Sequence, residues 1–157
     1  MVTFVLTVIG LILAASAVNA EEVTDFRMCR NARCEILNLD INPCPEALDH
    51  EPCQIPQNNT ASIAFRYLAK FNSKKPKTRL YAETAAGDLP LRDMDTNACL
   101  YTSCPIEMNV ESDWLYSLFI ETKYPKNSYT VKLKFWDDGP KASRKDVCCF
   151  KFDIKVV

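Results

Sequence analysis

The chain has 157 residues, of which 48% are hydrophobic and 25% are charged, and its formal net charge at pH 7 is −1. These values are typical of a single globular domain and exclude a fibrous or disordered chain. A charge so close to neutral gives no reason to expect nucleic acid or an anionic membrane as the main partner. Eight cysteines in a chain of this length indicate an oxidising compartment and a disulfide framework.

The first twenty residues have the features of a secretory signal peptide. They carry no charge, contain an apolar run from Val5 to Ala15, and end in the small residues of Val18-Asn19-Ala20. Cleavage after Ala20 predicts a mature domain spanning residues 21–157. An uncleaved anchor helix is the alternative, although the apolar run is shorter than the ~20 residues that span a bilayer. We therefore expect a secreted or lumenal protein.

Seven short segments of the mature chain alternate apolar and polar residues with the period of two that is typical of β-strands. They fall near residues 23–28, 37–41, 61–71, 79–84, 114–120, 130–135 and 150–156. Turn residues separate them, as at Tyr124-Pro125 and Asp137-Asp138-Gly139. Pro43-Cys44-Pro45 forbids helix and strand pairing, so a loop is expected from Cys44 to Cys53. The pattern predicts an all-β fold, an immunoglobulin-like two-sheet β-sandwich of about seven strands.

Outside these segments, few residues are candidates for chemistry. Asn58 begins the sequon Asn58-Asn59-Thr60 and is a candidate for N-glycosylation, with a polar strand cap as the alternative. His50 is the only histidine, so it has no second histidine with which to share a metal or a proton relay, and we interpret it as an exposed loop residue. No serine or cysteine lies in a nucleophile motif beside it, and no zinc-ligand spacing occurs. We expect no enzymatic activity, no cofactor and no metal.

The cysteines and prolines follow one another in a distinctive order. The features that define this order are Cys29, Pro43-Cys44-Pro45, Pro52-Cys53-Gln54-Ile55, Cys99, Cys104-Pro105-Ile106, Tyr124-Pro125, the segment 131–135 and Cys149-Phe150. The ordered set resembles the ML (lipid-recognition) domain family, which includes the small soluble Niemann–Pick type C sterol carrier and the group-two mite allergens. The resemblance runs from about Phe26 to Val156 and implies a disulfide-stapled sandwich that holds a lipid between its sheets.

The resemblance implies three disulfides. These are Cys29–Cys149, Cys44–Cys53 and Cys99–Cys104. Cys34 and Cys148 lie outside the shared set and are left to form a fourth bridge. Strand register argues for caution, because in one antiparallel ladder with Cys29 opposite Cys149, Cys34 would face residue 144. The exchanged pairing, Cys29–Cys148 with Cys34–Cys149, therefore stays open.

The resemblance also implies where a lipid would bind. Facing sheets normally mesh at a separation of about 10 Å, but a bridge such as Cys29–Cys149 at one edge would let them splay at the other and leave a dry cavity. The inward side chains that would line it are Ile63, Phe65, Tyr67, Leu80, Leu118, Ile120, Val131, Leu133, Phe150 and Phe152. By position in the family, Leu91, Ile120 and Tyr124 lie at its mouth, with Leu89 and Met94 nearby. From the inward set we expect Phe65, Leu118, Leu133 and Phe150 to contact the ligand.

The expected ligand is a sterol, a fatty acid or a similar apolar small molecule. Arg92-Asp93 replaces an apolar stretch of the sterol carriers, which leaves room for a fatty acid whose carboxylate Arg92 could meet. We expect a monomer that is secreted or reaches the lysosomal lumen and passes lipid to a membrane or receptor. A lipid-dependent interaction module for a receptor in innate immunity or chemosensation is the alternative. The basic stretch 74–79 is interpreted as a solvated hairpin tip, with docking to anionic headgroups or an acidic partner as the other possibility.

Overall fold

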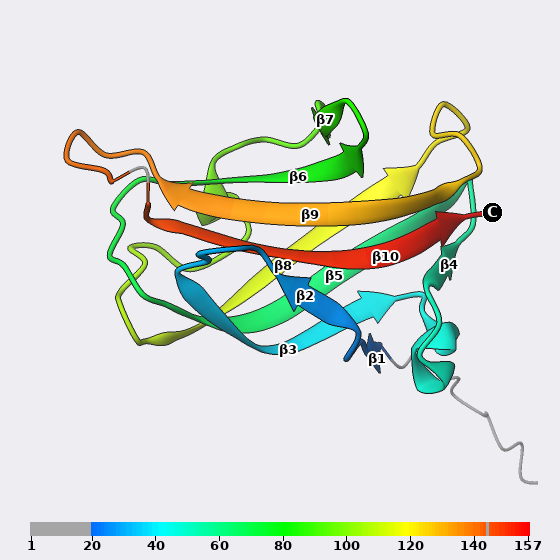
Figure 1. The fold of residues 1–157 in the computed structure, drawn as a ribbon, viewed down its shortest axis with the longest axis horizontal. Coiled ribbons are helices and arrows are strands. Elements are labelled where there is room, and N and C mark those ends of the chain that lie inside the picture. Colours follow the sequence, from blue (N-terminus) through cyan, green and yellow to red (C-terminus); the bar gives the residue numbers. More distant parts are fainter. Residues whose placement is uncertain (1–19, 144) are drawn as a thin grey trace, which may run out of the picture.

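The computed structural model of the protein describes residues 20–143 and 145–157 and contains two β-sheets packed face to face (Figure 1). One sheet has four strands in the order β1-β3-β5-β8; the other has six, in the order β2-β10-β9-β6-β7 with β4 beside β10. The strands are β1 (Glu21–Glu22), β2 (Phe26–Met28), β3 (Cys34–Asn42), β4 (Cys53–Ile55), β5 (Asn59–Ala69), β6 (Pro76–Thr84), β7 (Gly87–Pro90), β8 (Glu111–Ile120), β9 (Ser128–Asp137) and β10 (Val147–Val156). Two 3-10 helices, η1 (Pro45–Asp49) and η2 (Ala98–Leu100), lie in the connections.

The expected immunoglobulin-like sandwich is confirmed, and all seven predicted segments contain strands. Strands β1, β4 and β7 were not predicted, because segments of two to four residues are too short to show alternation. The expected signal peptide is residues 1–20, and all of it except Ala20 lies outside the described residues. Within the described part of the chain, no helix has the length and apolar character needed to cross a membrane.

The segment between Cys44 and Cys53 is more ordered than the prolines indicated. Pro45 begins η1, and Cys53 begins β4, which pairs in parallel with the end of β10. A proline in the first turn of a helix removes no helical hydrogen bond, because the N–H that it lacks would have no partner there. The expectation of a loop without helix or strand pairing was therefore wrong. The disulfide Cys44–Cys53 does close this segment, as the family implied.

All eight cysteines lie among the described residues, and none is free. They form the disulfides Cys29–Cys149, Cys34–Cys148, Cys44–Cys53 and Cys99–Cys104. The register argument failed because Cys34 does not continue the ladder of β2. The chain turns after β2, with Asn31 in the left-handed region at a φ of 62° and Cys34 as the first residue of β3 in the other sheet. The exchanged pairing is thereby excluded.

The two consecutive cysteines of β10 point to opposite faces of the strand, as its period of two requires. Cys148 faces the interior and bonds to Cys34 on the other sheet, with their Cα atoms 5.1 Å apart. Cys149 bonds to Cys29 just beyond β2, the neighbouring strand of the same sheet. Cys34–Cys148 therefore joins the two sheets, as Cys44–Cys53 does at the other end of β3. Assigning this role to Cys29–Cys149 was wrong.

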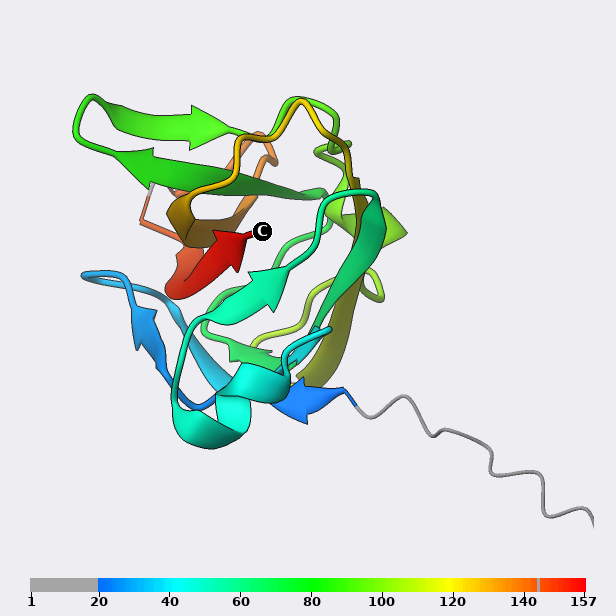
Figure 2. The ribbon, with the colours of Figure 1, turned by 90° about the vertical axis from the view of Figure 1, so that its right-hand side faces the viewer.

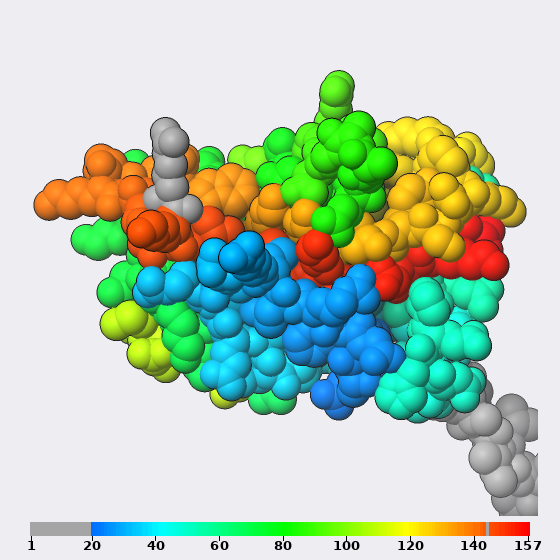
Figure 3. Space-filling model, viewed as in Figure 1, coloured from blue at the N-terminus to red at the C-terminus, as the bar shows by residue number. Residues whose placement is uncertain are grey.

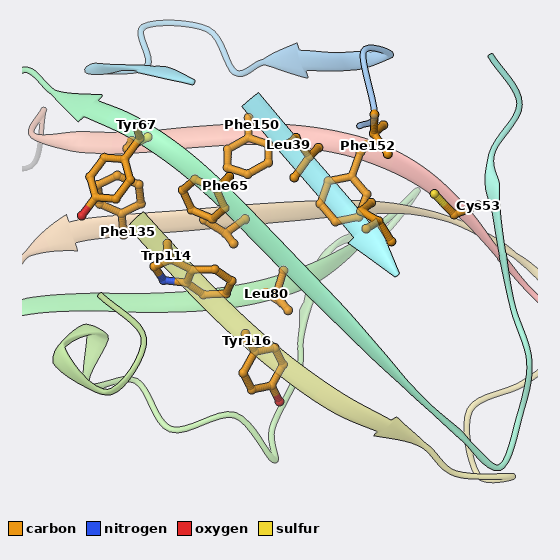
Figure 4. Packing of buried hydrophobic residues seen from close by; sticks show 14 of the residues in the cluster. Leu39, Cys53, Phe65, Tyr67, Leu80, Trp114, Tyr116, Phe135, Phe150 and Phe152 are labelled. Carbon is orange, nitrogen blue, oxygen red and sulfur yellow. The ribbon is translucent and has the colours of Figure 1, made fainter. Parts of the chain in front are cut away.

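Aromatic rings fill the interior next to this bridge (Figure 4). Phe135 is the cross-strand partner of Cys148, and its ring centroid lies 4.8 Å from that of Tyr67. The ring of Phe65 lies 5.0 Å from Trp114 in a stacked arrangement and 5.0 Å from Phe150 edge-on. All five side chains are buried. This end of the sandwich is a solid core.

Candidate functional site

A cavity of about 380 Å³ lies between the sheets at the end opposite the Cys34–Cys148 bridge. Figure 2 looks along the strands from this end, between the two sheets. The lining residues are Ile41, Ile55, Ala61, Ile63, Leu80, Tyr81, Ala82, Leu89, Pro90, Leu91, Tyr116, Leu118, Ile120, Tyr124, Pro125, Tyr129, Val131, Phe152, Ile154 and Val156. None of them carries a charge.

Side-chain size decides which end of the sandwich is filled. On β5, the inward residues change from Phe65 and Tyr67 near the bridge to Ala61 and Ile63 at the cavity. On β6, Ala82 lines the cavity. Because no disulfide joins the sheets on the side of β7 and β8 and the side chains are smaller, the interior is left partly unfilled.

The mouth of the cavity lies between the β7 edge of one sheet and the connection from β8 to β9. Leu89 on β7 lines the cavity while remaining 58% exposed. The Tyr124 hydroxyl donates a hydrogen bond to Asp93 Oδ2 over 3.3 Å, and Lys123 Nζ donates to the same oxygen over 2.8 Å. The hydrogen bond from Lys123 lowers the pKa of Asp93 below its ordinary value. An apolar cavity is thus bordered by a charged rim.

Tyr116 contributes a polar group to the wall that has no hydrogen-bond partner among the described residues. The Tyr116 hydroxyl makes no hydrogen bond to any described residue, whereas that of Tyr129 donates to the carbonyl oxygen of Pro125 over 2.7 Å. Burial raises the pKa of Tyr116 to about 12, so this hydroxyl is neutral throughout the physiological range. It can donate one hydrogen bond to a guest and accept another.

The family model that matches this chain is that of the ML domain, and the match covers residues 23–156. The chain belongs to the ML-domain family. The chain is 34% identical to an MD-2-related lipid-recognition protein of Manduca sexta over 141 residues, which cover 87% of each chain. It is 26% identical to NPC intracellular cholesterol transporter 2 of Sus scrofa over 147 residues, which cover 93% of this chain and 92% of the relative.

The fold of this ML domain is similar to that of a solved relative. The crystal structure of a Niemann-Pick type C2 protein from Japanese carpenter ant superposes with a TM-score of 0.72 at 17% identity. The superposition covers 84% of this chain and 98% of that one. At this level of identity the likeness concerns the fold alone.

The residues expected at the ligand site divide into two groups in this ML domain. Five of them lie on the cavity wall: Leu89, Leu91, Leu118, Ile120 and Tyr124. Four lie in the core outside that wall: Phe65, Met94, Leu133 and Phe150. Of these, Phe65 and Phe150 belong to the aromatic packing described above, and Leu133 pairs with Phe150 across strands. Inward alternation predicted Leu118 on the wall together with Phe65, Leu133 and Phe150 in the core, so it could not separate wall from core.

Several wall residues were not expected there. Tyr116 and Ala61 alternate with outward residues exactly as their neighbours do, so their inward direction was visible in the sequence. The useful signal was the small size of Ala61 and Ala82 at inward positions of long strands. Tyr129 extends the inward alternation of Val131, Leu133 and Phe135 by one position, so its direction was also visible in the sequence.

The β6–β7 hairpin, which supplies one wall of the cavity, is held from outside by ion pairs. Asp88 on β7 accepts hydrogen bonds from Lys132 over 2.5 Å and from Lys134 over 2.6 Å, and both lysines are on β9. Lys132 also bonds to Glu83 on β6 over 3.1 Å. The hydrogen bonds from Lys132 and Lys134 lower the pKa of Asp88. Burial acts to lower the pKa of Lys132, but its hydrogen bonds to Asp88 and Glu83 outweigh this and leave that pKa raised.

The other residues singled out from the sequence lie away from the cavity wall. His50 is exposed, and its Nδ1 lies 3.1 Å from Asp25 Oδ2. Asn58 is exposed in the turn before β5, and its glycosylation stays a prediction. Arg92 is exposed directly after the wall residue Leu91 and makes no ion pair with any described residue. The described residues contain no cluster of side chains suited to a metal ion.

The ion pairs of Asp88 predict a pH dependence of stability. Because the folded-state pKa of Asp88 lies below its ordinary value of 3.8, its contribution is fully present above about pH 4 and is lost as the pH falls through the lowered pKa. Asp88→Asn should lower the free energy of unfolding at pH 7 by about 1 kcal/mol and flatten its decline in acid. Urea unfolding between pH 2 and pH 7 measures both effects. Asp49→Asn, at an exposed aspartate without an ion pair among the described residues, should change neither the free energy of unfolding at pH 7 nor its decline in acid. Equal profiles for the two variants would contradict the assignment of this stabilisation to the ion pairs of Asp88.

Proposed function

We propose that this ML-domain protein is a secreted carrier that holds a sterol, a fatty acid or a similar apolar small molecule in the cavity and passes it on without chemical change. The observation that carries the proposal is the uncharged cavity of about 380 Å³, a size within the range of small-molecule pockets. Enclosing ~400 Å² of apolar ligand surface is worth on the order of 10 kcal/mol before the costs of binding are subtracted. The printed names of two relatives, a lipid-recognition protein and a cholesterol transporter, add support.

We favour an amphiphile with an anionic head group over a neutral sterol. An apolar chain would occupy the cavity, and its head group would lie at the rim, where Arg92 has no acidic partner among the described residues. A carboxylate there would form a charge-assisted, bidentate pair with the guanidinium group. Tyr116 offers a second anchor for a hydroxyl group deeper in the cavity.

The proposed route to an oxidising compartment rests on two observations. All eight cysteines are paired, and such frameworks form in secreted or lumenal proteins. The sequence of residues 1–20 has the pattern of a cleaved signal. We infer that the working form is residues 21–157, acting as a monomer outside the cell or in the lysosomal lumen.

Lipid hand-off requires a partner at the mouth, either a membrane or a receptor. The two strands that border the mouth, β7 and β8, are each the last strand of their sheet. Their exposed apolar side chains include Leu89, Leu115, which is 56% exposed, and Phe119, which is 51% exposed. Exposed apolar groups gathered at one place are typical of a contact surface.

Filling the cavity should abolish lipid binding. Ala61→Phe places a ring in the cavity, so the affinity for a fluorescent fatty acid and for a fluorescent sterol should fall at least about tenfold, as expected when packed volume replaces ligand volume. Fluorescence titration gives the affinities, and native mass spectrometry identifies the lipid that copurifies with each protein. Ala64→Phe, on the outer face of the same strand, is the matched control. A carrier function is contradicted if Ala61→Phe binds both probes as tightly as the parent protein.

Removing an apolar side chain at the mouth should slow transfer without weakening binding. Phe119→Ser is expected to lower the rate at which bound fluorescent lipid moves to acceptor vesicles several-fold, because the contact surface loses apolar area. Leu48→Ser, at a 73% exposed leucine on η1, serves as the control. Equal transfer rates for both variants would show that this edge takes no part in hand-off.

The signal peptide predicts a defined mature end. When the full chain is expressed in a secretory host, the protein in the medium should begin at Glu21, and its mass should show eight hydrogens fewer than the reduced chain, two for each disulfide. N-terminal sequencing and intact mass spectrometry measure these properties. Retention in the membrane fraction with residues 1–20 still attached would instead support the anchor alternative.

A further inference from the structure

The outer face of the six-stranded sheet carries an array of cations. Across strands, Arg79 on β6 is opposite Lys134 on β9, and Lys132 on β9 is opposite Lys151 on β10. Lys77 belongs to the same face, two residues before Arg79 on β6. We call these five residues the cationic face. Figure 3 views the molecule from the side of this sheet, with β9 in orange and β10 in red.

The cations outnumber the carboxylates around them. Lys132 and Lys134 share Asp88, while Lys132 and Lys151 share Glu83. Lys77 and Arg79, the other two members of the cationic face, form no ion pair with a described residue. Two further acids lie nearby: Asp153 is paired with Arg27, and Asp95 lies in the segment whose Asn97 pairs with Lys77 on β6. The five cations thus share only two carboxylates in ion pairs, on a chain whose net charge is −1.

Arg79 has a buried N–H group without a hydrogen-bond partner among the described residues. It is half-buried, and its Nε is shielded from solvent without a hydrogen bond to any described residue. A buried donor left unpaired costs free energy, and this cost would be removed if the Arg79 side chain turned outward and bound an anion through Nε and a terminal nitrogen of its guanidinium group. The basic stretch 74–79 is therefore more than a hairpin tip, because β6 begins at Pro76 and sets the Arg79 side chain on the sheet.

Two aromatic residues lie among the cations. Trp136 is half-buried and directly opposite Lys77 across strands, and Tyr81 is opposite Lys132. Lys134 Nζ lies 4.8 Å from the centroid of the Tyr81 ring. Flat rings beside cations suit a ligand that presents both flat apolar surfaces and negative charges.

The architecture of this face argues against two other partners. β6 and β9 have neighbours along both sides, so no strand edge at the centre of the face is open to an added peptide strand. The large apolar side chains that are exposed among the described residues belong to loops, to the other sheet or, for Met28 and Leu89, to inward positions of edge strands. A bilayer-docking surface would need such side chains next to its cations.

From these observations we propose that the cationic face binds an anionic polysaccharide that bears sulfate or carboxylate groups, with Arg79 and Lys77 at the centre of the contact and Trp136 against a sugar ring. Neighbouring strands are about 4.8 Å apart, and alternate residues along a strand are about 7 Å apart, so the array presents charges at intervals suited to a repeating polyanion. Sugar rings supply the flat apolar surfaces, and oxidised cysteines indicate a compartment where such polymers occur. The face lies on the outside of the sheet, so the proposal does not depend on which ligand the cavity holds.

The test uses mature protein with all four disulfides formed and immobilised heparin, a sulfated polysaccharide, as the probe. Arg79→Glu and Lys77→Glu should each lower the affinity about tenfold at 0.1 M salt and reduce the slope of log affinity against log salt by about one or more, because each removes a contact that releases counterions. Arg79→Lys keeps the charge but loses the bidentate geometry, so it should lower the affinity less than Arg79→Glu does while leaving the salt slope unchanged. Lys126→Glu, at an exposed lysine between β8 and β9, makes the same change in net charge and should retain most of the affinity.

Binding of the fluorescent fatty acid by each variant shows whether the fold is intact, and it separates failure of this proposal from failure of the carrier function. The proposal is overturned if Lys126→Glu weakens heparin binding as much as Arg79→Glu, since attraction would then follow net charge alone. It is also overturned if heparin does not bind while vesicles containing phosphatidylserine, or poly-glutamate, bind in an Arg79-dependent way. Retained heparin binding in an intact Arg79→Glu, Lys77→Glu double variant would overturn it as well.

Discussion

The constraint on which the cavity depends is that disulfides join the two sheets only on the side of β3. Cys34 and Cys148 hold β3 against β10 beside Phe135, and aromatic rings fill the space next to this link. At the other end of β3, Cys44–Cys53 joins the segment after that strand to β4 in the six-stranded sheet, whereas Cys29–Cys149 and Cys99–Cys104 do not join the sheets. On the opposite side, where β7 and β8 are the last strands, no disulfide holds the sheets together and the hydrophobic effect alone favours closing them. A guest molecule that fills the space removes that driving force.

The strands around the cavity each have one face toward the cavity and one face toward the outside of the molecule. On β8, Leu118 and Ile120 line the cavity while Phe119 between them is exposed on the other side. On β9, Val131 lines the cavity while Lys132 bonds to carboxylates outside. An antiparallel sheet makes this possible because successive side chains alternate between its faces. The same short sequence can thus form a lipid-binding wall and an ionic surface.

Alternation in the sequence was sufficient to predict the two-sheet fold, because it reports directly which side chains leave the solvent. It could not show whether the interior is filled. Phe65 and Ile120 both point inward, yet one packs against Trp114 and the other faces the cavity, and the difference follows the size of the inward side chains around them, which are small at Ala61 and Ala82. Disulfide connectivity was similarly beyond local pattern, because Cys34 changes sheets after the turn at Asn31. The start of β6 was placed too late, because the lysines at positions 74, 75 and 77 suggested a hairpin tip where the strand begins at Pro76.

Asp88 is on the outer face of β7, directly before a residue of the cavity wall. Its carboxylate bonds to Lys132 and Lys134 on the outside, and the next residue, Leu89, is part of the cavity wall. An anion that drew these lysines away would loosen the hold on β7, and a guest that shifted β7 would alter the lysines in turn. Linkage makes such an effect reciprocal, so each occupant would change the affinity of the other by the same factor. The Asp88 carboxylate therefore connects the outer surface of the sandwich to the wall of its cavity.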